Sequence, residues 1–261
     1  MKYDLAISIV VYKKYEDAVD AVRSIEKNTG SKLKKRIFII DNSCLPDDVA
    51  GRKRFEQEMR SYEDVVYIDT KKNLGFGKGH NFTMDRLSCD YFAIVNPDIL
   101  LTEGAFERIL EYMEDKKVGM AIPKIVDENG NLQDAYRRQL TVFDMLIRMF
   151  VKKGFQKRRD YHSMKEMDYS APFEVPFGQG SFLVIRTDLW KELHGFDDDY
   201  FMYLEDADLC RRVNLVSRLM YCPKATVIHK WKKGSHRNVR LFIIHVRSMI
   251  TYFNKWGWKL V

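Results

Sequence analysis

The sequence predicts an α/β fold: a mainly parallel sheet with helices on both faces. Three observations support this prediction. Short apolar runs alternate with amphipathic stretches through the first half of the chain. Turn-forming polar residues follow several of the apolar runs, as expected where buried strands end. The 261 residues are 46% hydrophobic and 31% charged, which is enough to bury one sizeable core. In such sheets, ligands bind beyond the carboxyl ends of the strands.

The first half of the chain contains most of the predicted elements. The first strand is expected at residues 5–11. A helix at 15–29 follows, and its face toward the core is formed by Ala18, Ala21, Val22 and Ile25, which recur at helical spacing. The remaining strands of this half are expected at 37–40, 65–68, 91–95 and 118–122. The helices between them are expected at 47–62, 79–88 and 103–115.

The second half is less regular. Residues 125–139 are polar around an Asp-Glu-Asn-Gly turn. Residues 152–167, with six Lys/Arg against two acids, predict an exposed loop or a broken helix. Strands are expected at 173–185 and 219–227, and helices at 188–194 and 206–216. We interpret residues 1–236 as one domain and residues 237–261 as a basic helical appendage.

The net charge of +7 is concentrated at one end of the chain. From His229 onward there are eight Lys/Arg and no acid, so a polyanionic partner such as a membrane surface would meet the protein there. The core lacks a nucleic-acid recognition motif, and nucleic acid is not an expected partner. The four cysteines form no C-x-x-C pair, and no secretory signal or bilayer-length apolar stretch is present. These features favour a cytoplasmic protein with reduced thiols.

Two polar clusters follow the second and third predicted strands. In Asp41-Asn42-Ser43, the carboxylate could accept hydrogen bonds from a nucleobase or a ribose, although the same residues also form ordinary turns. The segment 73–81 contains glycines at 75, 77 and 79, which allow close backbone approach, and Gly79 could open a helix facing an anion. Its spacing fits neither a dinucleotide fingerprint nor a Walker loop, and a flexible turn is the alternative.

Two further clusters carry carboxylates. Asn96-Pro97-Asp98 follows the fourth strand, where a carboxylate suits a hard divalent cation, although this tripeptide is also a common turn. The segment 201–212 contains three acids at the start of a helix, where the macrodipole alone favours them. The alternative is that one acid, kept ionised by the helix start, is a general base. Glu205 and Asp206 lie about 100° apart on a helix, so only one faces a given site.

The ordered set of motifs resembles the inverting GT-A glycosyltransferases of glycosyltransferase family 2, which include bacterial cell-envelope enzymes. The resemblance spans residues 5 to about 236 and rests on the four clusters, on Ser8-Ile-Val-Val-Tyr12 and on Gly178-Gln-Gly180-Ser-Phe. Within the family the chain most resembles rhamnosyltransferases that use dTDP-L-rhamnose. This implies inverting transfer of a sugar to a hydroxyl of a saccharide acceptor during cell-surface polysaccharide assembly. A UDP-galactofuranose or UDP-N-acetylglucosamine donor, and a non-catalytic membrane- or nucleic-acid-binding module, are the alternatives.

The resemblance also implies a role for each site residue. Base and ribose contacts would come from Val11, Tyr12 and Asp41. The nucleotide would be flanked by Asn73, Gly75, Phe76 and Gly77, and Gly180 would let a sugar approach the backbone. Asp98 would be the main ligand of Mg²⁺ or Mn²⁺, with Asn96 as an indirect metal contact or a ribose contact. His229 would be a further metal or diphosphate ligand, although Lys230 and Lys232 could steady the diphosphate instead.

Asp206 would be the catalytic base, with Glu205 orienting the acceptor or capping the helix. Beyond the motifs, residues 239–253 predict an amphipathic helix whose apolar face is formed by Phe242, Val246, Met249, Ile250 and Phe253. Surrounded by basic residues and by Trp231, Trp256 and Trp258, this helix suits peripheral docking on an anionic cytoplasmic leaflet, where a lipid-linked acceptor would be found. The alternative is that the same face packs on the core.

Overall fold

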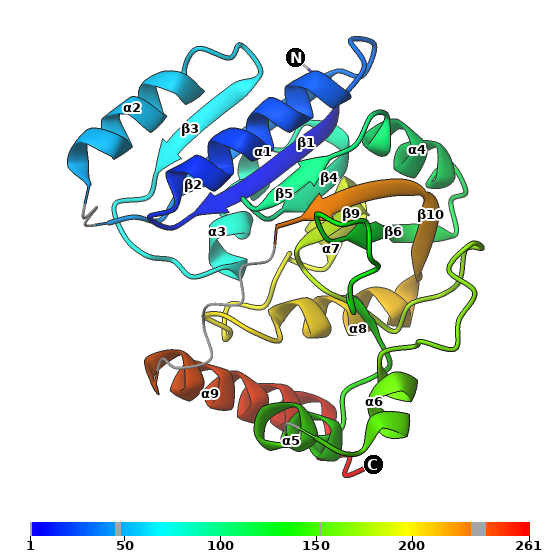
Figure 1. Cartoon of the computed structure of the whole chain (residues 1–261). Coiled ribbons are helices and arrows are strands. Elements are labelled where there is room, and N and C mark those ends of the chain that lie inside the picture. Colours follow the sequence, from blue (N-terminus) through cyan, green and yellow to red (C-terminus); the bar gives the residue numbers. More distant parts are fainter. Residues whose placement is uncertain (1, 45–47, 152, 231–238) are drawn as a thin grey trace.

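A mixed eight-stranded sheet forms the centre of the computed structural model, which describes residues 2–44, 48–151, 153–230 and 239–261 (Figure 1). The strand order is β3-β2-β1-β4-β9-β6-β10-β5. In chain order these strands are β1 (Tyr3–Val11), β2 (Lys35–Asp41), β3 (Val65–Asp69), β4 (Cys89–Val95), β5 (Ile99–Leu101), β6 (Val118–Val126), β9 (Phe182–Arg186) and β10 (Arg218–His229).

Most neighbouring strands in the sheet are parallel, which confirms the predicted fold class. Strands β3, β2, β1 and β4 run in one direction, and β6 is parallel to β10. The exceptions are β9, which runs antiparallel between β4 and β6, and the edge strand β5. The single strand expected at 173–185 is wrong. The short β8 (Phe177–Gly178) pairs instead with β7 (Tyr136–Arg137) in a separate two-stranded sheet, and the chain turns at Gln179–Ser181 before β9.

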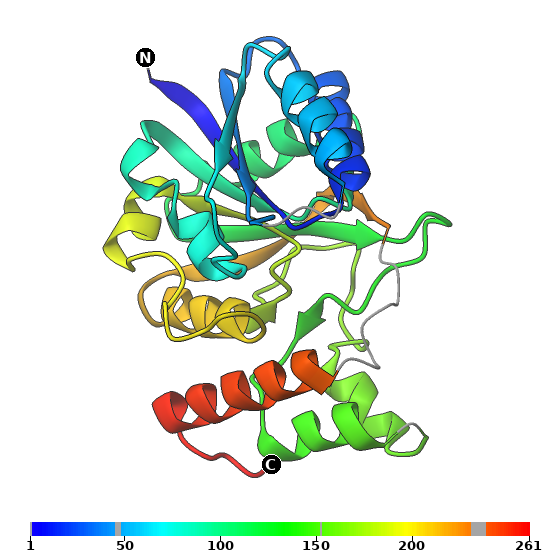
Figure 2. The ribbon, with the colours of Figure 1, turned by 90° about the vertical axis from the view of Figure 1, so that its left-hand side faces the viewer.

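Helices cover both faces of the sheet, with α1 and α2 on one side and α3 and α8 on the other (Figure 2). Helix α1 buries Ala18, Ala21, Val22 and Ile25, as the spacing predicts. The helices in chain order are α1 (Tyr15–Asn28), α2 (Val49–Met59), α3 (Gly77–Asn81), the 3₁₀ turn η1 (Met84–Arg86), α4 (Ala105–Tyr112), α5 (Val142–Phe150), α6 (Gln156–His162), α7 (Thr187–Glu192), α8 (Glu205–Val216) and α9 (Val239–Trp256). The helix expected at 79–88 is therefore divided into α3 and η1.

A second helical layer, made of α5, α6 and α9, lies beyond α8 and away from the sheet (Figure 2). The backbone N–H groups of Val142 and Phe143 donate to the carbonyls of Lys259 and Leu260 at 2.9 and 3.1 Å, which ties α5 to the chain beyond α9. The sequence did not predict α5, and α6 lies where a loop or broken helix was expected. Trp231, Lys232, Lys233 and Arg237 lie outside the described residues.

Helix α9 packs on the rest of the chain through its C-terminal half. Ser248, Tyr252 and Phe253 are buried, and the Ser248 hydroxyl donates to the Met202 carbonyl at 2.8 Å. Of the predicted apolar face, Phe253 is buried whereas Phe242 and Ile250 are exposed, so only part of the face packs on the core. The buried stripe is rotated toward Ser248, whose hydroxyl finds a backbone partner. Within the described residues, no helix combines the length and apolar character that crossing a bilayer requires.

Candidate active site

The carboxyl ends of β1, β2 and β4 meet at one edge of the sheet. Val11, the last residue of β1, pairs with Asp41, the last residue of β2. The Asn96-Pro97-Asp98 turn begins directly after β4. Tyr12 lies immediately beyond β1, and 48% of the residue is exposed, so its ring is accessible to a ligand. The sheet therefore gathers the predicted polar clusters at the edge where α/β folds bind ligands.

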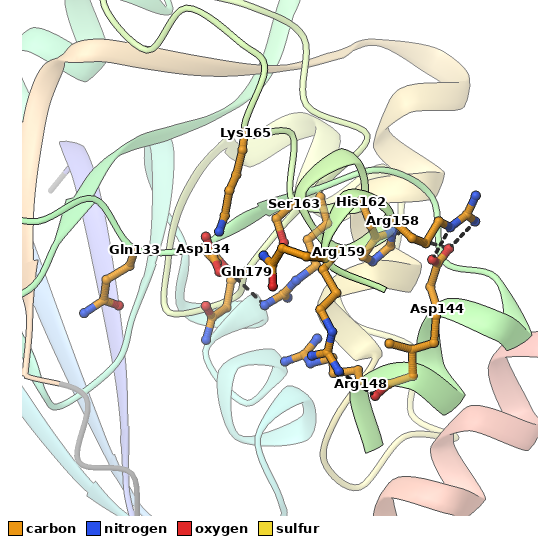
Figure 3. Close-up of a pocket in the computed structure, with 13 residues that line it drawn as sticks. Gln133, Asp134, Asp144, Arg148, Arg158, Arg159, His162, Ser163, Lys165 and Gln179 are labelled. Carbon is orange, nitrogen blue, oxygen red and sulfur yellow. Dashed lines mark hydrogen bonds and ion pairs between the residues drawn. The ribbon is translucent and has the colours of Figure 1, made fainter. Parts of the chain in front are cut away.

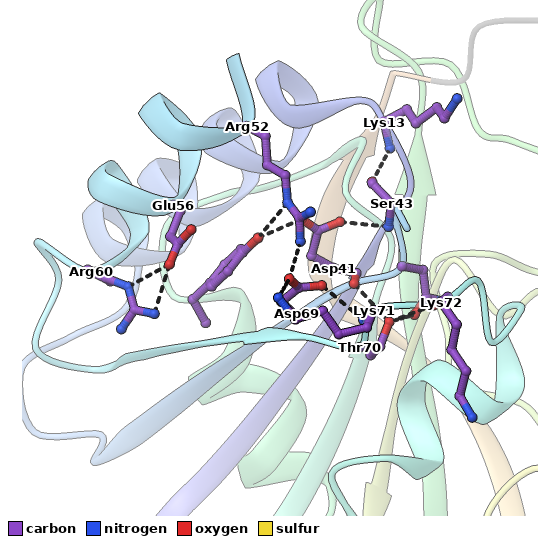
Figure 4. Close-up of polar contacts among 12 residues, drawn as sticks. Lys13, Asp41, Ser43, Arg52, Glu56, Arg60, Asp69, Thr70, Lys71 and Lys72 are labelled. Carbon is purple, nitrogen blue, oxygen red and sulfur yellow. Dashed lines mark hydrogen bonds and ion pairs between the residues drawn. The ribbon is translucent and has the colours of Figure 1, made fainter. Parts of the chain in front are cut away.

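Asp41 is fully buried, and its carboxylate is held by the protein (Figure 4). One oxygen accepts from the Ser43 N–H at 2.8 Å. The other accepts from the Tyr67 hydroxyl at 2.6 Å and from Arg52 Nε at 3.0 Å. Arg52 also pairs with Asp69 at 2.6 Å. These bonds fix the end of β2, and a contact between Asp41 and the base or ribose of a donor stays a prediction.

The loop after β3 is locked onto the segment that precedes α8. Gly75 has φ of 82°, and a Cβ there would lie 2.1 Å from the Phe201 carbonyl oxygen, so only glycine fits. The Phe76 N–H donates to that same carbonyl at 3.0 Å. Asn73 accepts from the Gly75 N–H through its side-chain oxygen at 2.9 Å. The loop is thus held beside the start of α8, where the predicted base lies.

Helix α3 begins at Gly77, and the expectation that Gly79 opens a helix toward an anion is wrong. A Cβ on Gly77 would lie 2.9 Å from Phe196 Cβ, and one on Gly79 would lie 2.8 Å from a Val10 methyl group. Both glycines are buried. Their small size lets this five-residue helix pack on the protein's own side chains. The predicted nucleotide contacts of this loop remain predictions.

Asp98 and His229 face each other at the strand ends. His229 Nε2 lies 3.3 Å from Asp98 Oδ1, and His229 is 2% exposed. Gln133 fixes the ring: its amide nitrogen donates to the His229 carbonyl at 2.9 Å, so its oxygen accepts from Nδ1 at 3.0 Å. Nε2 is therefore the ring nitrogen that faces Asp98. Burial raises the pKa of Asp98, but His229 and Lys14 outweigh it and lower the pKa.

Glu205 and Asp206 begin α8 and point in different directions. Glu205 is 4% exposed, and its Oε2 has no hydrogen-bond partner within the described part of the chain. Asp206 accepts from the Gly180 N–H at 2.9 Å and from the Ala207 N–H at 2.8 Å. This divergence agrees with the predicted angular separation on a helix. The third acid, Asp208, binds Arg212 and Trp256 and so joins α8 to α9.

The two adjacent carboxyl groups have different electrostatic surroundings. Burial and the neighbouring Asp206 charge raise the pKa of Glu205 well above its usual value. Burial also raises the pKa of Asp206, which the helix start alone was expected to keep ionised. Hydrogen bonds from Gly180 and Ala207, and then the charges of Arg137 and Arg148, act in the opposite direction. In this pair, the proton therefore belongs on Glu205 and the negative charge on Asp206.

A short backbone segment, Gly180–Ser181, links the turn that contains Asp98 to Asp206 at the start of α8. The Asn96 N–H donates to the Ser181 carbonyl at 2.8 Å, and the preceding residue, Gly180, binds Asp206. A Cβ on Gly180 would lie 3.0 Å from Asp206 Cβ, so the approach is tight. The Asn96-Pro97-Asp98 turn and Asp206 are consequently bound to adjacent residues of the same backbone segment. The structure thus brings Asn96, Asp98, Gly180, Glu205, Asp206 and His229 into one site.

Four further residues belong to this site although the sequence did not single them out. Gln133 holds His229, Ser181 holds Asn96, and Arg137 and Arg148 act on Asp206. All four are isolated polar residues whose partners are far away in sequence. A cluster of three or more His, Cys, Asp or Glu residues that could hold a metal is absent from the described ranges. Asp98 and His229 could therefore supply only part of a metal's ligands, as suits a metal that also binds a diphosphate.

Comparisons with known proteins bear on the family and the fold of the chain. The family model described as Glycosyl transferase family 2 matches residues 6–193. Rhamnosyltransferase WbbL of Escherichia coli is 30% identical over 192 residues, which cover 68% of this chain and 69% of the relative. The N-acetylglucosaminyl-diphospho-decaprenol L-rhamnosyltransferase of Mycobacterium tuberculosis is 29% identical over 66% of this chain and 60% of the relative. Part of each relative therefore has no counterpart in the alignment.

A solved structure supports the fold assignment. The crystal structure of GalNAc-T7 with UDP, GalNAc and Mn²⁺ matches with a TM-score of 0.71 at 14% identity, covering 97% of this chain and 48% of that one. At this identity, the likeness establishes the GT-A fold. The same fold thus holds a nucleotide and a divalent metal in that protein.

Proposed function

This chain belongs to glycosyltransferase family 2, and on that premise we propose that it transfers L-rhamnose from dTDP-L-rhamnose to a hydroxyl of a saccharide acceptor, with inversion. One observation carries the proposal. The Gly180–Ser181 segment binds Asp206 on one side and the turn that contains Asp98 on the other. The proposed base and the turn that contains the proposed metal ligand are thereby bound to two adjacent residues of the chain. The biological setting proposed is assembly of bacterial cell-surface polysaccharide.

In the proposed reaction, Asp206 accepts the proton of the acceptor hydroxyl as its oxygen attacks the anomeric carbon. A bond forms between that oxygen and the carbon, and the bond from the carbon to the phosphate oxygen breaks, leaving its electron pair on the nucleoside diphosphate. The attack comes from the face opposite the leaving group, so the configuration inverts. Asp206 is suited to this role because its charge is supported by two N–H groups and two arginines.

Asp98 and His229 fit a divalent metal such as Mg²⁺ or Mn²⁺. The Asp98 carboxylate and His229 Nε2 lie 3.3 Å apart, and Gln133 holds the ring in that orientation. When bound, the metal would neutralise charge that develops on the leaving diphosphate. The chain's own residues orient the donor: Asp98 and Asn96 at the phosphates and ribose, and Tyr12 and Phe76 at the base.

The rhamnose donor is favoured by the two named relatives, both rhamnosyltransferases. The alternative donors are UDP-galactofuranose and UDP-N-acetylglucosamine. Purified protein incubated with each of the three donors, an acceptor and Mg²⁺ or Mn²⁺ tests the proposal by the nucleoside diphosphate released. We expect preferential use of dTDP-L-rhamnose and a product of opposite anomeric configuration. Efficient use of a UDP sugar without use of dTDP-L-rhamnose would contradict the donor assignment.

A cytoplasmic location at the inner face of the membrane is part of the proposal. The layer of α5, α6 and α9 with the chain end exposes many large apolar side chains beside basic residues such as Arg247 and Lys153. This apolar and basic surface is suited to an anionic leaflet. The exposed apolar residues of this layer are Leu146, Phe150, Phe155, Tyr161, Val239, Phe242, Ile243, Ile250, Trp258, Leu260 and Val261. Membership in an enzyme family argues against the non-catalytic alternative.

A further inference from the structure

A cavity of about 350 Å³ lies between the β7–β8 sheet and helices α5 and α6 (Figure 3). Most of its charged lining is cationic, and its acids are Asp134 and Asp144. The cationic and imidazole groups are Arg137, Arg148, Arg158, Arg159, His162 and Lys165. We refer to this space as the arginine cavity.

Several of these groups already form hydrogen bonds or ion pairs within the protein. Arg158 makes two bonds of 2.7 Å to the Asp144 carboxylate. Arg159 donates to backbone carbonyls, including that of Ile147 at 3.3 Å. Lys165 pairs with Asp160 at 3.0 Å. Burial lowers the pKa of His162 to about 4, so this imidazole is neutral at neutral pH.

Arg137 and Arg148 remain without a carboxylate at ion-pair distance among the residues that the structure describes. Arg137 is 8% exposed and donates one hydrogen bond, to the Asp134 carbonyl at 2.9 Å. Arg148, in the last turn of α5, is accessible to solvent within the cavity. Burial and the Arg148 charge lower the pKa of Arg137 to about 9, so it remains a cation at neutral pH. Two neighbouring cations in a recess favour a bound anion.

The position of the cavity indicates which substrate carries that anion. Arg137 and Arg148 both act on the charge of Asp206, whereas the charged groups that act on Asp98 are His229 and Lys14. Gln179 lines the cavity and directly precedes Gly180, whose N–H binds Asp206. The cavity therefore opens on the base side of the site, where the acceptor hydroxyl must lie. The donor's diphosphate has its own partners around Asp98.

We propose that Arg137 and Arg148 bind a phosphate or diphosphate group on the acceptor, which is therefore a glycosyl phosphate ester and not a neutral saccharide. This inference rests on the proposed function, because it assigns the acceptor of that reaction. A guanidinium presents paired N–H donors to phosphate oxygens, and Arg148 is an exposed residue that lines the cavity. The sugar next to the phosphate would then present a hydroxyl to Asp206.

A binding experiment tests the site without requiring turnover. Inorganic pyrophosphate is titrated calorimetrically into the full chain in EDTA, with and without saturating dTDP. The variants are Arg148→Gln, Arg148→Lys and the matched control Lys157→Gln, which removes an exposed charge from α6 outside the cavity. We expect Arg148→Gln to bind pyrophosphate about 10- to 100-fold more weakly, with partial recovery in Arg148→Lys and no change in Lys157→Gln. Unchanged binding in Arg148→Gln, or complete displacement by dTDP, would overturn the inference.

A kinetic experiment then identifies the acceptor. Three acceptors with the same sugar are compared: a neutral alkyl glycoside, a short-alkyl diphosphate ester and a farnesyl diphosphate ester in neutral vesicles. We expect both diphosphate esters to have a KM about 10- to 100-fold lower than the neutral glycoside, and Arg148→Gln to remove that difference in KM. A similar KM for the two esters assigns recognition to the phosphate, and a further gain with farnesyl assigns an added lipid contact.

The two ways of failing are separable. Equal KM values for the neutral glycoside and the diphosphate esters, with no effect of Arg148→Gln on either, overturn the phosphate site and leave the glycosyltransferase proposal intact. Arginine-dependent pyrophosphate binding with no transfer from any donor overturns the proposed donor and leaves the anion site intact.

Discussion

The strand-end region and the arginine cavity flank the same site but are built differently. In the strand-end region, which comprises the carboxyl ends of β1, β2 and β4 with His229, charged groups are paired with one another. Asp41 is bound by Arg52, and Asp98 faces His229. In the arginine cavity, Arg137 and Arg148 have no carboxylate at ion-pair distance within the described ranges. Parallel strands position the first region, and short helices with a two-stranded sheet position the second.

This difference suggests a division of labour between a fixed and an adaptable region. Neighbouring strands hold each strand end in a fixed position. Strand ends therefore suit the nucleotide part of the donor, which is the same in every reaction cycle. Arg137 on β7 and Arg148 on α5 have no carboxylate at ion-pair distance within the described ranges, so they suit a ligand that supplies one or more anionic oxygens. We therefore expect changes in the strand-end region to affect the donor and the metal, and changes in the arginine cavity to affect the acceptor.

Asp98→Ala should have the largest effect and should be confined to the donor. The variant loses the carboxylate that faces His229, so metal-stimulated turnover should disappear and affinity for the nucleoside diphosphate should fall. Steady-state rates with and without EDTA, and calorimetric titration with dTDP and Mn²⁺, measure both quantities. Full activity of the variant, or of the wild type in EDTA, would remove the metal from the mechanism.

Asp206→Asn should come next and should separate chemistry from donor binding. The amide keeps the shape and much of the hydrogen bonding but cannot accept a proton, so kcat should fall by about 10²–10⁴-fold. Donor affinity should stay nearly unchanged, because the donor's charge is handled around Asp98. Stopped-time assays of transfer and dTDP titrations give the two numbers.

Glu205→Gln is the matched control for that prediction. Because the pKa of Glu205 is raised well above its usual value, glutamine resembles the neutral side chain already present. This variant should lower kcat much less than Asp206→Asn does. The reverse order, with near wild-type rates in Asp206→Asn and a collapse in Glu205→Gln, would assign the base to Glu205.

Gln133→Ala should weaken the metal site without removing a ligand. Gln133 fixes the His229 ring through two hydrogen bonds, of 2.9 and 3.0 Å. Loss of such a supporting partner usually lowers metal affinity about 10- to 100-fold. Mn²⁺ titration of activity at saturating donor measures this, and a high Mn²⁺ concentration should restore the rate. If the apparent Mn²⁺ affinity stays at the wild-type value, His229 is not oriented by Gln133.

The sequence predicted the strand-end region well because local patterns encode it. Buried strands are apolar runs, and the residue after each run lies at the sheet edge whatever else the chain does. The face of α1 followed directly from helical spacing. For these elements, tertiary structure only had to bring predicted ends together.

The arginine cavity could not be predicted in the same way, because residues far apart in the sequence must come together to form it. Arg137 and Arg148 look like ordinary surface cations until β7 and α5 bring them near Asp206. Helix α5 is nine residues long and its apolar residues follow a helical period, which the sequence prediction missed. One local signal was present: the Thr141 hydroxyl accepts from the Asp144 N–H, as at the start of a capped helix. The proton on Glu205 depends on burial, which no local pattern specifies.

The smallest effect we predict concerns the outer face of the helical layer and compares it with the opposite end of the molecule. Arg247 is exposed on α9, beside the apolar side chains of Phe242 and Ile243, whereas Lys53 is exposed on α2. If the helical layer docks on an anionic leaflet, Arg247→Gln should remove about 1 kcal/mol of binding, or about a fivefold loss of affinity. Lys53→Gln removes the same charge from a surface that does not meet the lipid and should change nothing. Flotation with anionic and neutral vesicles, at low and high salt, measures this. Equal losses of vesicle affinity in the two variants would mean that binding depends only on the net charge of the protein. If no salt-sensitive binding to anionic vesicles is seen, the docking surface is ruled out.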